Sequence, residues 1–152
     1  MKVYRLSRTK YANDLKGMGA YATGGRWNNK NVYCLYASES KALALLEYTV
    51  NVNIDDIPRA LSFLTLEIPD NNIISLTEAD LPGDWKAVPA PSSTKQFGSA
   101  LLLAATAPII KIPSTIIPGE FNYLLNPLHA DNRRVKILKT EDFVYDVRIK
   151  VI

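Results

Sequence analysis

The chain has 152 residues, of which 47% are hydrophobic and 22% are charged, a balance that is ordinary for one globular domain and excludes extensive disorder. The net charge of +3 comes from scattered basic residues rather than a dense basic stripe, so we expect no direct nucleic-acid partner. A single cysteine excludes an internal disulfide, no apolar run reaches the roughly 20 residues of a membrane helix, and the N-terminus lacks a signal-peptide core. We therefore expect one cytoplasmic domain over residues 1–152, with no metal and no membrane partner.

The first third of the sequence predicts two strands, a long loop and a helix. Val3–Ser7 has the residues of a short strand, and residues 8–30 hold four glycines without clear periodicity. A long loop of this kind is often a binding element. The apolar run Asn31–Ala37 predicts a buried strand. Ser38 is the expected N-cap of a helix over Glu39–Val50.

The rest of the chain predicts several strands and a second helix. The sequence Ser93–Gln96 has the spacing of a capping box and predicts a helix that ends near Ala105. Prolines and a glycine between residues 113 and 127 predict a series of turns. Apolar or alternating runs predict strands at residues 64–68, 73–76, 109–112, 135–138 and 143–151. The fold class is therefore α+β, with strands gathered towards both ends of the chain and helices between them.

Glu47 is the one carboxylate in the apolar stretch KALALLEYTV. A helix that is apolar on every side is buried, and a carboxylate buried among leucines is usually paired or functional because an unpaired buried charge is costly. The alternative places Glu47 at a helix edge, where it reaches solvent beside Tyr48. The spacing favours neither interpretation over the other.

Two arginines are candidates for contact with an anionic ligand. Arg26 lies in the sequence GGRWNN, where glycines let the backbone approach a ligand and a guanidinium can grip a phosphate through two parallel hydrogen bonds. The alternative is a turn arginine stacked on Trp27. Arg5, on the first predicted strand, is a weaker candidate, because an arginine there is often only a surface residue.

Three further side chains could contribute to a site. Tyr36 ends a buried strand, where it can stack on a flat ring or donate a hydrogen bond, although spacing alone favours a core tyrosine. Ser114 follows Pro113, where it could touch a ligand, but capping a turn is its default role. The lone histidine, His129, is interpreted as structural, because neither a G-x-S-x-G nucleophile motif nor enough zinc ligands accompany it.

Taken in order, these segments resemble the RES domain family, which is named for its arginine, glutamate and serine. Here the name-giving residues are Arg26, Glu47 and Ser114. The resemblance covers nearly the whole chain, and the ordered set of matching segments is stronger evidence than any one segment alone. The matching segments are Tyr4-Arg5, Gly24–Asn28, Tyr36–Ser38, Ala44–Glu47, Pro113-Ser114 and Asn122–His129.

The resemblance implies a fold like that of ADP-ribosyltransferases, whose mixed, split sheet with flanking helices binds NAD⁺ in a central cleft. It implies a toxin paired with an Xre-type, helix-turn-helix antitoxin. Such a toxin depletes NAD⁺ by hydrolysis or phosphorolysis, without a metal. A protein ADP-ribosyltransferase on the same scaffold is the first alternative. A non-catalytic binding module is the second, and the intact arginine, glutamate and serine set argues against it.

The chemistry of NAD⁺ agrees with this implication. Nicotinamide leaves as a neutral molecule from a pyridinium, so cleavage needs no proton donor, and one carboxylate facing the developing ribose cation can suffice. Glu47 fits that role, with Arg26 and Tyr36 as further catalytic residues. The expected substrate contacts are the pyrophosphate with Arg26 and Arg5, the nicotinamide with Tyr36, and the nicotinamide or its ribose with Ser114. Asn122, from the last matching segment, completes the expected substrate-binding set.

Overall fold

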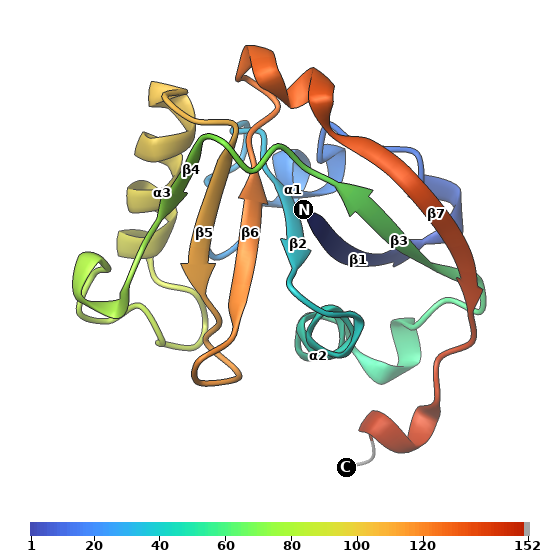
Figure 1. Cartoon of the computed structure of the whole chain (residues 1–152). Helices are drawn as coiled ribbons and strands as arrows, with labels where there is room; N and C mark the ends of the chain where they lie inside the picture. Colours follow the sequence, from blue (N-terminus) through green and yellow to red (C-terminus); the bar gives the residue numbers. More distant parts are fainter. Residues whose placement is uncertain (151–152) are drawn as a thin grey trace.

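Seven strands form one mixed sheet in the computed structural model, which describes residues 1–150 (Figure 1). The strand order is β4-β5-β6-β2-β1-β3-β7, and only the β4–β5 pair is parallel. The strands are β1 (Lys2–Arg8), β2 (Leu35–Ser38), β3 (Leu61–Glu67), β4 (Ile73–Ser75), β5 (Ile109–Pro113), β6 (Phe121–Leu125) and β7 (Lys136–Phe143). The α-helices are α1 (Met18–Thr23), α2 (Lys41–Asn51) and α3 (Ser92–Ala104). Short 3-10 helices are η1 (Thr9–Tyr11), η2 (Ile54–Asp56), η3 (Glu78–Asp80), η4 (Ala130–Arg134) and η5 (Val147–Lys150).

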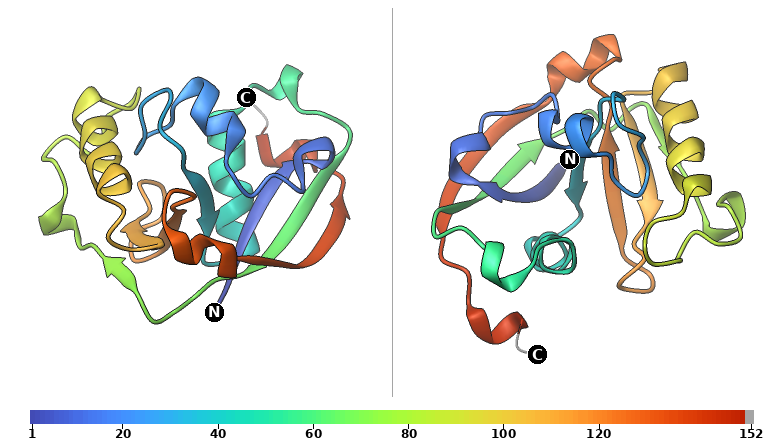
Figure 2. Two further views of the ribbon diagram at one scale, coloured as in Figure 1. Left: turned by 90° about the horizontal axis from the view of Figure 1, so that it is seen from above. Right: turned by 180° about the vertical axis from the view of Figure 1, so that it is seen from behind.

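The sheet has two halves that meet at a narrow junction. Strands β1 and β2 are in register only at Tyr4 and Ser38, whereas β1 pairs with β3 along all of Lys2–Arg8. Figure 1 shows β1, β3 and β7 curving away from the flatter β4-β5-β6-β2 half, with α2 below the junction. The rear view in Figure 2 shows α3 beside the β4-β5-β6 half and apart from α2. The predicted α+β class, with a mixed sheet and flanking helices, is confirmed.

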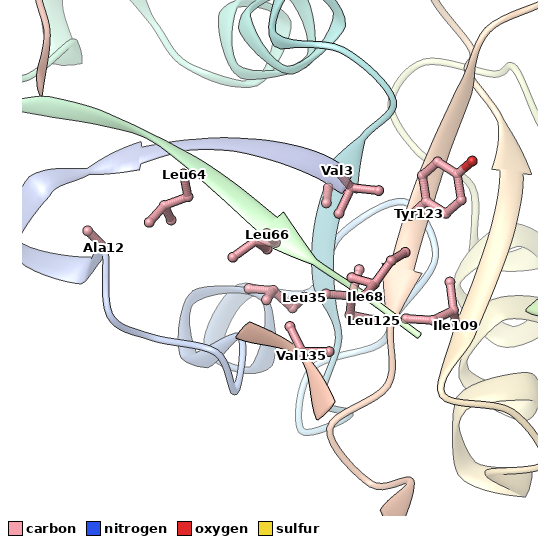
Figure 3. Packing of buried hydrophobic residues seen from close by; sticks show 11 residues of the cluster. Val3, Ala12, Leu35, Leu64, Leu66, Ile68, Ile109, Tyr123, Leu125 and Val135 are labelled. Atoms are coloured by element: carbon pink, nitrogen blue, oxygen red, sulfur yellow. The ribbon is translucent and has the colours of Figure 1, made fainter. Parts of the chain in front are cut away.

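Apolar side chains cover both faces of the central strands. In β5, Ile109 packs on one face of the sheet, while Ile110 and Ile112 pack on the other, because successive side chains of a strand point to opposite faces. The first face joins the two halves of the sheet through a cluster that includes Val3, Leu35, Leu64, Leu66 and Leu125 (Figure 3). The second face packs against α3 through Leu102. Strands buried on both sides explain why several segments are apolar runs without alternation.

The helix that carries the acidic candidate differs from its prediction at its start and in its burial. Its N-cap is Ser40, whose Oγ accepts a hydrogen bond from the backbone N–H of Leu43 at 3.1 Å. Ser38, the predicted cap, is instead the last residue of β2, so the predicted start is wrong by two residues. The expectation of a helix buried all round is also wrong, because α2 buries one face and leaves Val50 57% exposed.

The boundaries of other elements also differ from the predicted ones, for local physical reasons. The predicted capping box at Ser93–Gln96 is wrong: α3 begins after Pro91 without a side-chain cap, and the hydroxyl of Ser93 donates to Asp84. The strand predicted at 31–37 is shorter, since Asn31 adopts a positive φ of 68°. The loop predicted at 8–30 contains η1 and α1, and β6 lies in the segment predicted as turns.

The C-terminal strand ends earlier than predicted. Strand β7 stops at Phe143, and residues 147–150 form η5. The predicted strand over 143–151 therefore holds at Phe143 and is wrong over 144–150, while Val151 lies outside the described residues. In this segment Arg148 donates hydrogen bonds to the carboxylate of Asp146, two residues earlier, in an exposed ion pair. Within residues 1–150, no helix combines the length and apolar character of a membrane span.

Candidate functional site

Glu47 is held by donors from two other elements of the fold. Its Oε1 accepts hydrogen bonds from Nδ2 of Asn122 on β6 at 2.6 Å and from Oγ of Ser114 after β5 at 3.1 Å. The Glu47 side chain is half-buried, and both of these hydrogen bonds are made to Oε1. Glu47 is thus a paired carboxylate rather than an isolated buried charge or a free helix-edge residue. Within the described part of the chain its second oxygen, Oε2, accepts no hydrogen bond and is available for another partner.

Ser114 connects this carboxylate to a tight turn. Its buried Oγ accepts hydrogen bonds from the backbone N–H groups of Ile116 at 3.0 Å and Ile117 at 3.2 Å, and its O–H donates a hydrogen bond to Glu47. A serine hydroxyl has one donor and two acceptor positions, so this hydroxyl is fully used. The turn-capping interpretation is confirmed, and the same hydroxyl orients Glu47. Direct contact of Ser114 with nicotinamide or ribose stays a prediction.

Arg26 projects from a tight loop and is fixed by backbone oxygens from a distant segment. Its Nη1 donates to the carbonyls of Trp85 at 3.0 Å and Ala87 at 2.8 Å. Partial burial lowers the pKa of Arg26, and the negative charge of Glu47 opposes this shift. Trp27, the proposed stacking partner in the turn interpretation, is buried with its ring edge against Phe97 of α3.

Tyr36 fixes the loop from which Arg26 projects. Its hydroxyl accepts from the backbone N–H of Trp27 at 3.0 Å and donates to Oδ1 of Asn28 at 2.6 Å. Burial raises the pKa of Tyr36 well above its ordinary value, so the hydroxyl keeps its proton. A Cβ on Gly25 would lie 2.7 Å from this hydroxyl, which explains the second glycine of the GGRWNN sequence. Stacking of Tyr36 on nicotinamide stays a prediction.

Replacing Tyr36 by Phe is expected to lower the free energy of unfolding by about 1–3 kcal/mol, because it leaves a buried N–H and a buried amide oxygen without a partner. Denaturant unfolding measures this change. The control is Tyr33→Phe, since the ring of Tyr33 stacks on Tyr21 and its hydroxyl makes no hydrogen bond within residues 1–150. Equal stability of the two variants would show that other contacts hold the loop.

Arg5 lies at the junction between the two halves of the sheet. Its Nη1 donates to the carbonyl of Tyr36 at 2.9 Å, and so adds a bond where β1 and β2 share one register pair. Burial lowers the pKa of Arg5, and Asp14 acts in the opposite direction. Arg5 is half-buried, so the interpretation as a mere surface residue is wrong. Its contact with a pyrophosphate stays a prediction.

Three polar residues in this region were given no site role in the sequence analysis. Asn28 is buried and bonds Tyr36, Lys95 on α3 donates to the carbonyl of Gly25 at 2.7 Å, and Ser38 donates to Oδ1 of Asn122 at 2.6 Å. Each resembles an ordinary turn, surface or cap residue in sequence, so periodicity contains no signal for it. The structure thus joins Glu47 with Ser114 and Asn122, and Arg5 with Tyr36. Tyr36 in turn bonds the loop that carries Arg26, without a hydrogen bond to the Arg26 side chain itself.

His129 and the described cavities lie apart from these contacts. Nδ1 of His129 accepts from the backbone N–H of Asp131 at 3.0 Å and caps η4, which confirms its structural interpretation. One cavity of about 200 Å³ includes Lys16 and Tyr33 in its wall, and another of about 430 Å³ includes Arg133. Neither cavity is lined by Arg5, Arg26 or Glu47. The candidate site is therefore defined by the hydrogen bonds of these side chains and not by a cavity. Within residues 1–150, no three His, Cys, Asp or Glu side chains gather as metal ligands would.

Comparison with known sequences gives a consistent family match. The model of the family described as RES domain matches residues 2–146. A Prs ADP-ribosylating toxin from Sphingobium sp. (strain YBL2) is 38% identical over 146 residues, covering 94% of this chain and 91% of the relative. A Toxin Res from Photorhabdus laumondii subsp. laumondii is 37% identical, covering 98% and 97% of the two chains. A Toxin Res from Yersinia enterocolitica is 34% identical, covering 99% and 100%.

A solved structure shares the fold. A chain in the crystal structure of the M. tuberculosis MbcT–MbcA toxin–antitoxin complex is similar with a TM-score of 0.73. The similarity covers 94% of this chain and 84% of that chain, at 19% sequence identity. At this level of identity the likeness concerns the arrangement of strands and helices.

Proposed function

Because the chain belongs to the RES domain family, we propose that it cleaves the nicotinamide–ribose bond of NAD⁺ and acts as the toxin of a bacterial toxin–antitoxin pair. The observation that carries the proposal is the Glu47 carboxylate, held through one oxygen by Asn122 and Ser114. Two fixed donors on Oε1 leave Oε2 to face a substrate.

In this mechanism, the bond between C1′ of the ribose and the pyridinium nitrogen breaks, and both bonding electrons go to the nitrogen. Nicotinamide leaves neutral, and positive charge develops on the ribose. Oε2 of Glu47 lies opposite that charge and stabilises it, an effect that is large where water is partly excluded. Water or phosphate then adds to C1′, with loss of a proton, to give ADP-ribose or its phosphorylated form.

The arginines would bind the negatively charged diphosphate. A guanidinium has five N–H donors, and the carbonyls of Trp85 and Ala87 take only those on Nη1 of Arg26. Nε and Nη2 make no hydrogen bond within residues 1–150 and could make two parallel bonds to a phosphate. Arg5 has remaining donors of the same kind. The ring of Tyr36, fixed through its hydroxyl, would lie against the nicotinamide.

A protein side chain is a second candidate acceptor for the ADP-ribose group, and one relative supports it. The Sphingobium relative is named an ADP-ribosylating toxin, so a protein side chain could take the place of water at C1′. Incubation with labelled NAD⁺ and a cell extract, with and without phosphate, distinguishes the routes. Free ADP-ribose or its phosphorylated form supports hydrolysis or phosphorolysis, and label on a protein band supports transfer. Absence of nicotinamide release under every condition contradicts the whole proposal.

The proposed place of action is the cytoplasm, and the proposed partner is an Xre-type antitoxin encoded beside the toxin gene. Expression of the protein alone is expected to slow bacterial growth and lower cellular NAD⁺, and co-expression of the antitoxin should restore both. Growth curves and NAD⁺ assays in cells with soluble protein measure this. Unhindered growth with normal NAD⁺ would count against a toxin.

A further inference from the structure

A hydrogen-bonded chain runs from the sheet junction to Glu47. Ser38 ends β2, is 3% exposed, and faces Asn122 in the β2–β6 register. Its Oγ lies 2.6 Å from Oδ1 of Asn122, and Nδ2 of Asn122 lies 2.6 Å from Oε1 of Glu47. Ser38 is also the one residue of β2 in register with β1, through Tyr4. The chain therefore starts where the two halves of the sheet are joined.

The direction of each hydrogen bond in this chain is fixed by chemistry. An ionised carboxylate only accepts, so the amide of Asn122 must present its NH₂ group to Glu47. The carbonyl oxygen of the amide then faces Ser38, whose hydroxyl must donate. Asn122 is consequently held at both ends, and bonds arranged head to tail strengthen one another.

The role of Ser38 follows from what its hydroxyl holds. Without it, Oδ1 of Asn122 loses its partner and the amide is free to rotate, which loosens the donor that orients Glu47. We propose that Ser38 is a positioning residue that acts on Glu47 through Asn122, an inference that rests on the proposed function. It does not touch the substrate. The carboxylate matters most as positive charge develops on the ribose, so its misplacement lowers kcat rather than raising KM.

The test is a double-mutant cycle on nicotinamide release by the purified protein. Ser38→Ala should lower kcat by about fivefold and change KM by less than about twofold, as expected for the loss of one net hydrogen bond. Asn122→Ala should lower kcat by at least as much. The double variant should match Asn122→Ala alone, because removal of Asn122 breaks the path from Ser38. If the two substitutions act independently, their separate fold-losses in kcat would instead multiply in the double variant.

Two further variants separate positioning from folding. Ser38→Cys keeps nearly the same size but offers only a weak donor, so it should fold like the parent and lose most of the same activity. It replaces Ser38→Ala in the cycle if the alanine variant is unfolded. The control Ser40→Ala removes the N-cap of the same helix, so it should lower the melting temperature and leave kcat per folded molecule unchanged.

The outcomes distinguish the two proposals. A parent protein that releases no nicotinamide overturns the proposed function and the role of Ser38 with it. An active parent whose kcat is unaffected by Ser38→Ala or Ser38→Cys overturns the role of Ser38 alone. So does a double variant whose losses multiply. A loss in kcat that disappears in the Asn122→Ala background supports the positioning role.

Discussion

Replacement of Glu47 by Gln is expected to lower the rate of nicotinamide release by a factor of about 10² or more. The amide oxygen of the new side chain can still accept from Asn122 and Ser114, so the side chain should keep its place. Its NH₂ group would then take the position of Oε2 and turn a positive edge towards the developing ribose cation. The affinity for NAD⁺ should change far less, because that charge exists only during bond breaking.

Stability separates this catalytic role from a structural one. Because the Glu47→Gln variant would keep both hydrogen bonds and lose a partly buried charge, its melting temperature should stay the same or rise. The matched control is Glu39→Gln, since Glu39 also accepts a bond from β6, at the N–H of Phe121, but is exposed. It should leave turnover unchanged. Near-normal turnover in a destabilised Glu47→Gln protein would falsify the catalytic assignment.

The fold could be predicted where local pattern and burial agree. The apolar run at 109–112 is a strand buried on both faces, and the end of α3 near Ala105 coincides with a residue in the left-handed region. Strand β6 was missed because its five residues, Phe121–Leu125, lie between turn-forming residues, and tertiary pairing with β2 and β5 decides their conformation. The start of α2 was misplaced because Ser38 and Ser40 are equally plausible caps in sequence.

The candidate site was predictable in its charged residues and not in its hydrogen bonds. Glu47 is conspicuous because one carboxylate interrupts an apolar helix, and Arg26 because two glycines precede it. The bonds from Arg26 go to the main-chain carbonyls of Trp85 and Ala87, and no residue type in the sequence marks a carbonyl oxygen. Contacts of this kind depend on how separate segments are brought together by the sheet.

Replacement of Arg26 by Lys is expected to weaken NAD⁺ binding by roughly tenfold or more, since a charge-assisted hydrogen bond is worth on the order of 1.5–3 kcal/mol. Lysine keeps the positive charge but loses the planar group that can hold two carbonyls and still direct Nε and Nη2 at a phosphate. The single ammonium group of lysine cannot hold the two carbonyls and bind a phosphate through two parallel hydrogen bonds at the same time. Equilibrium binding of NAD⁺ in the Glu47→Gln background avoids turnover during the measurement.

The same substitution also tests whether Arg26 is only a turn residue. A turn arginine that holds Trp85 and Ala87 predicts a lower melting temperature with unchanged NAD⁺ affinity, whereas a phosphate clamp predicts a loss of affinity beyond any loss of folded protein. The control is Arg134→Lys, an exposed arginine with one described hydrogen bond, to Asn71, which should change neither quantity. If Arg26→Lys binds NAD⁺ as tightly as the parent, the diphosphate lies elsewhere and Arg26 serves the loop alone.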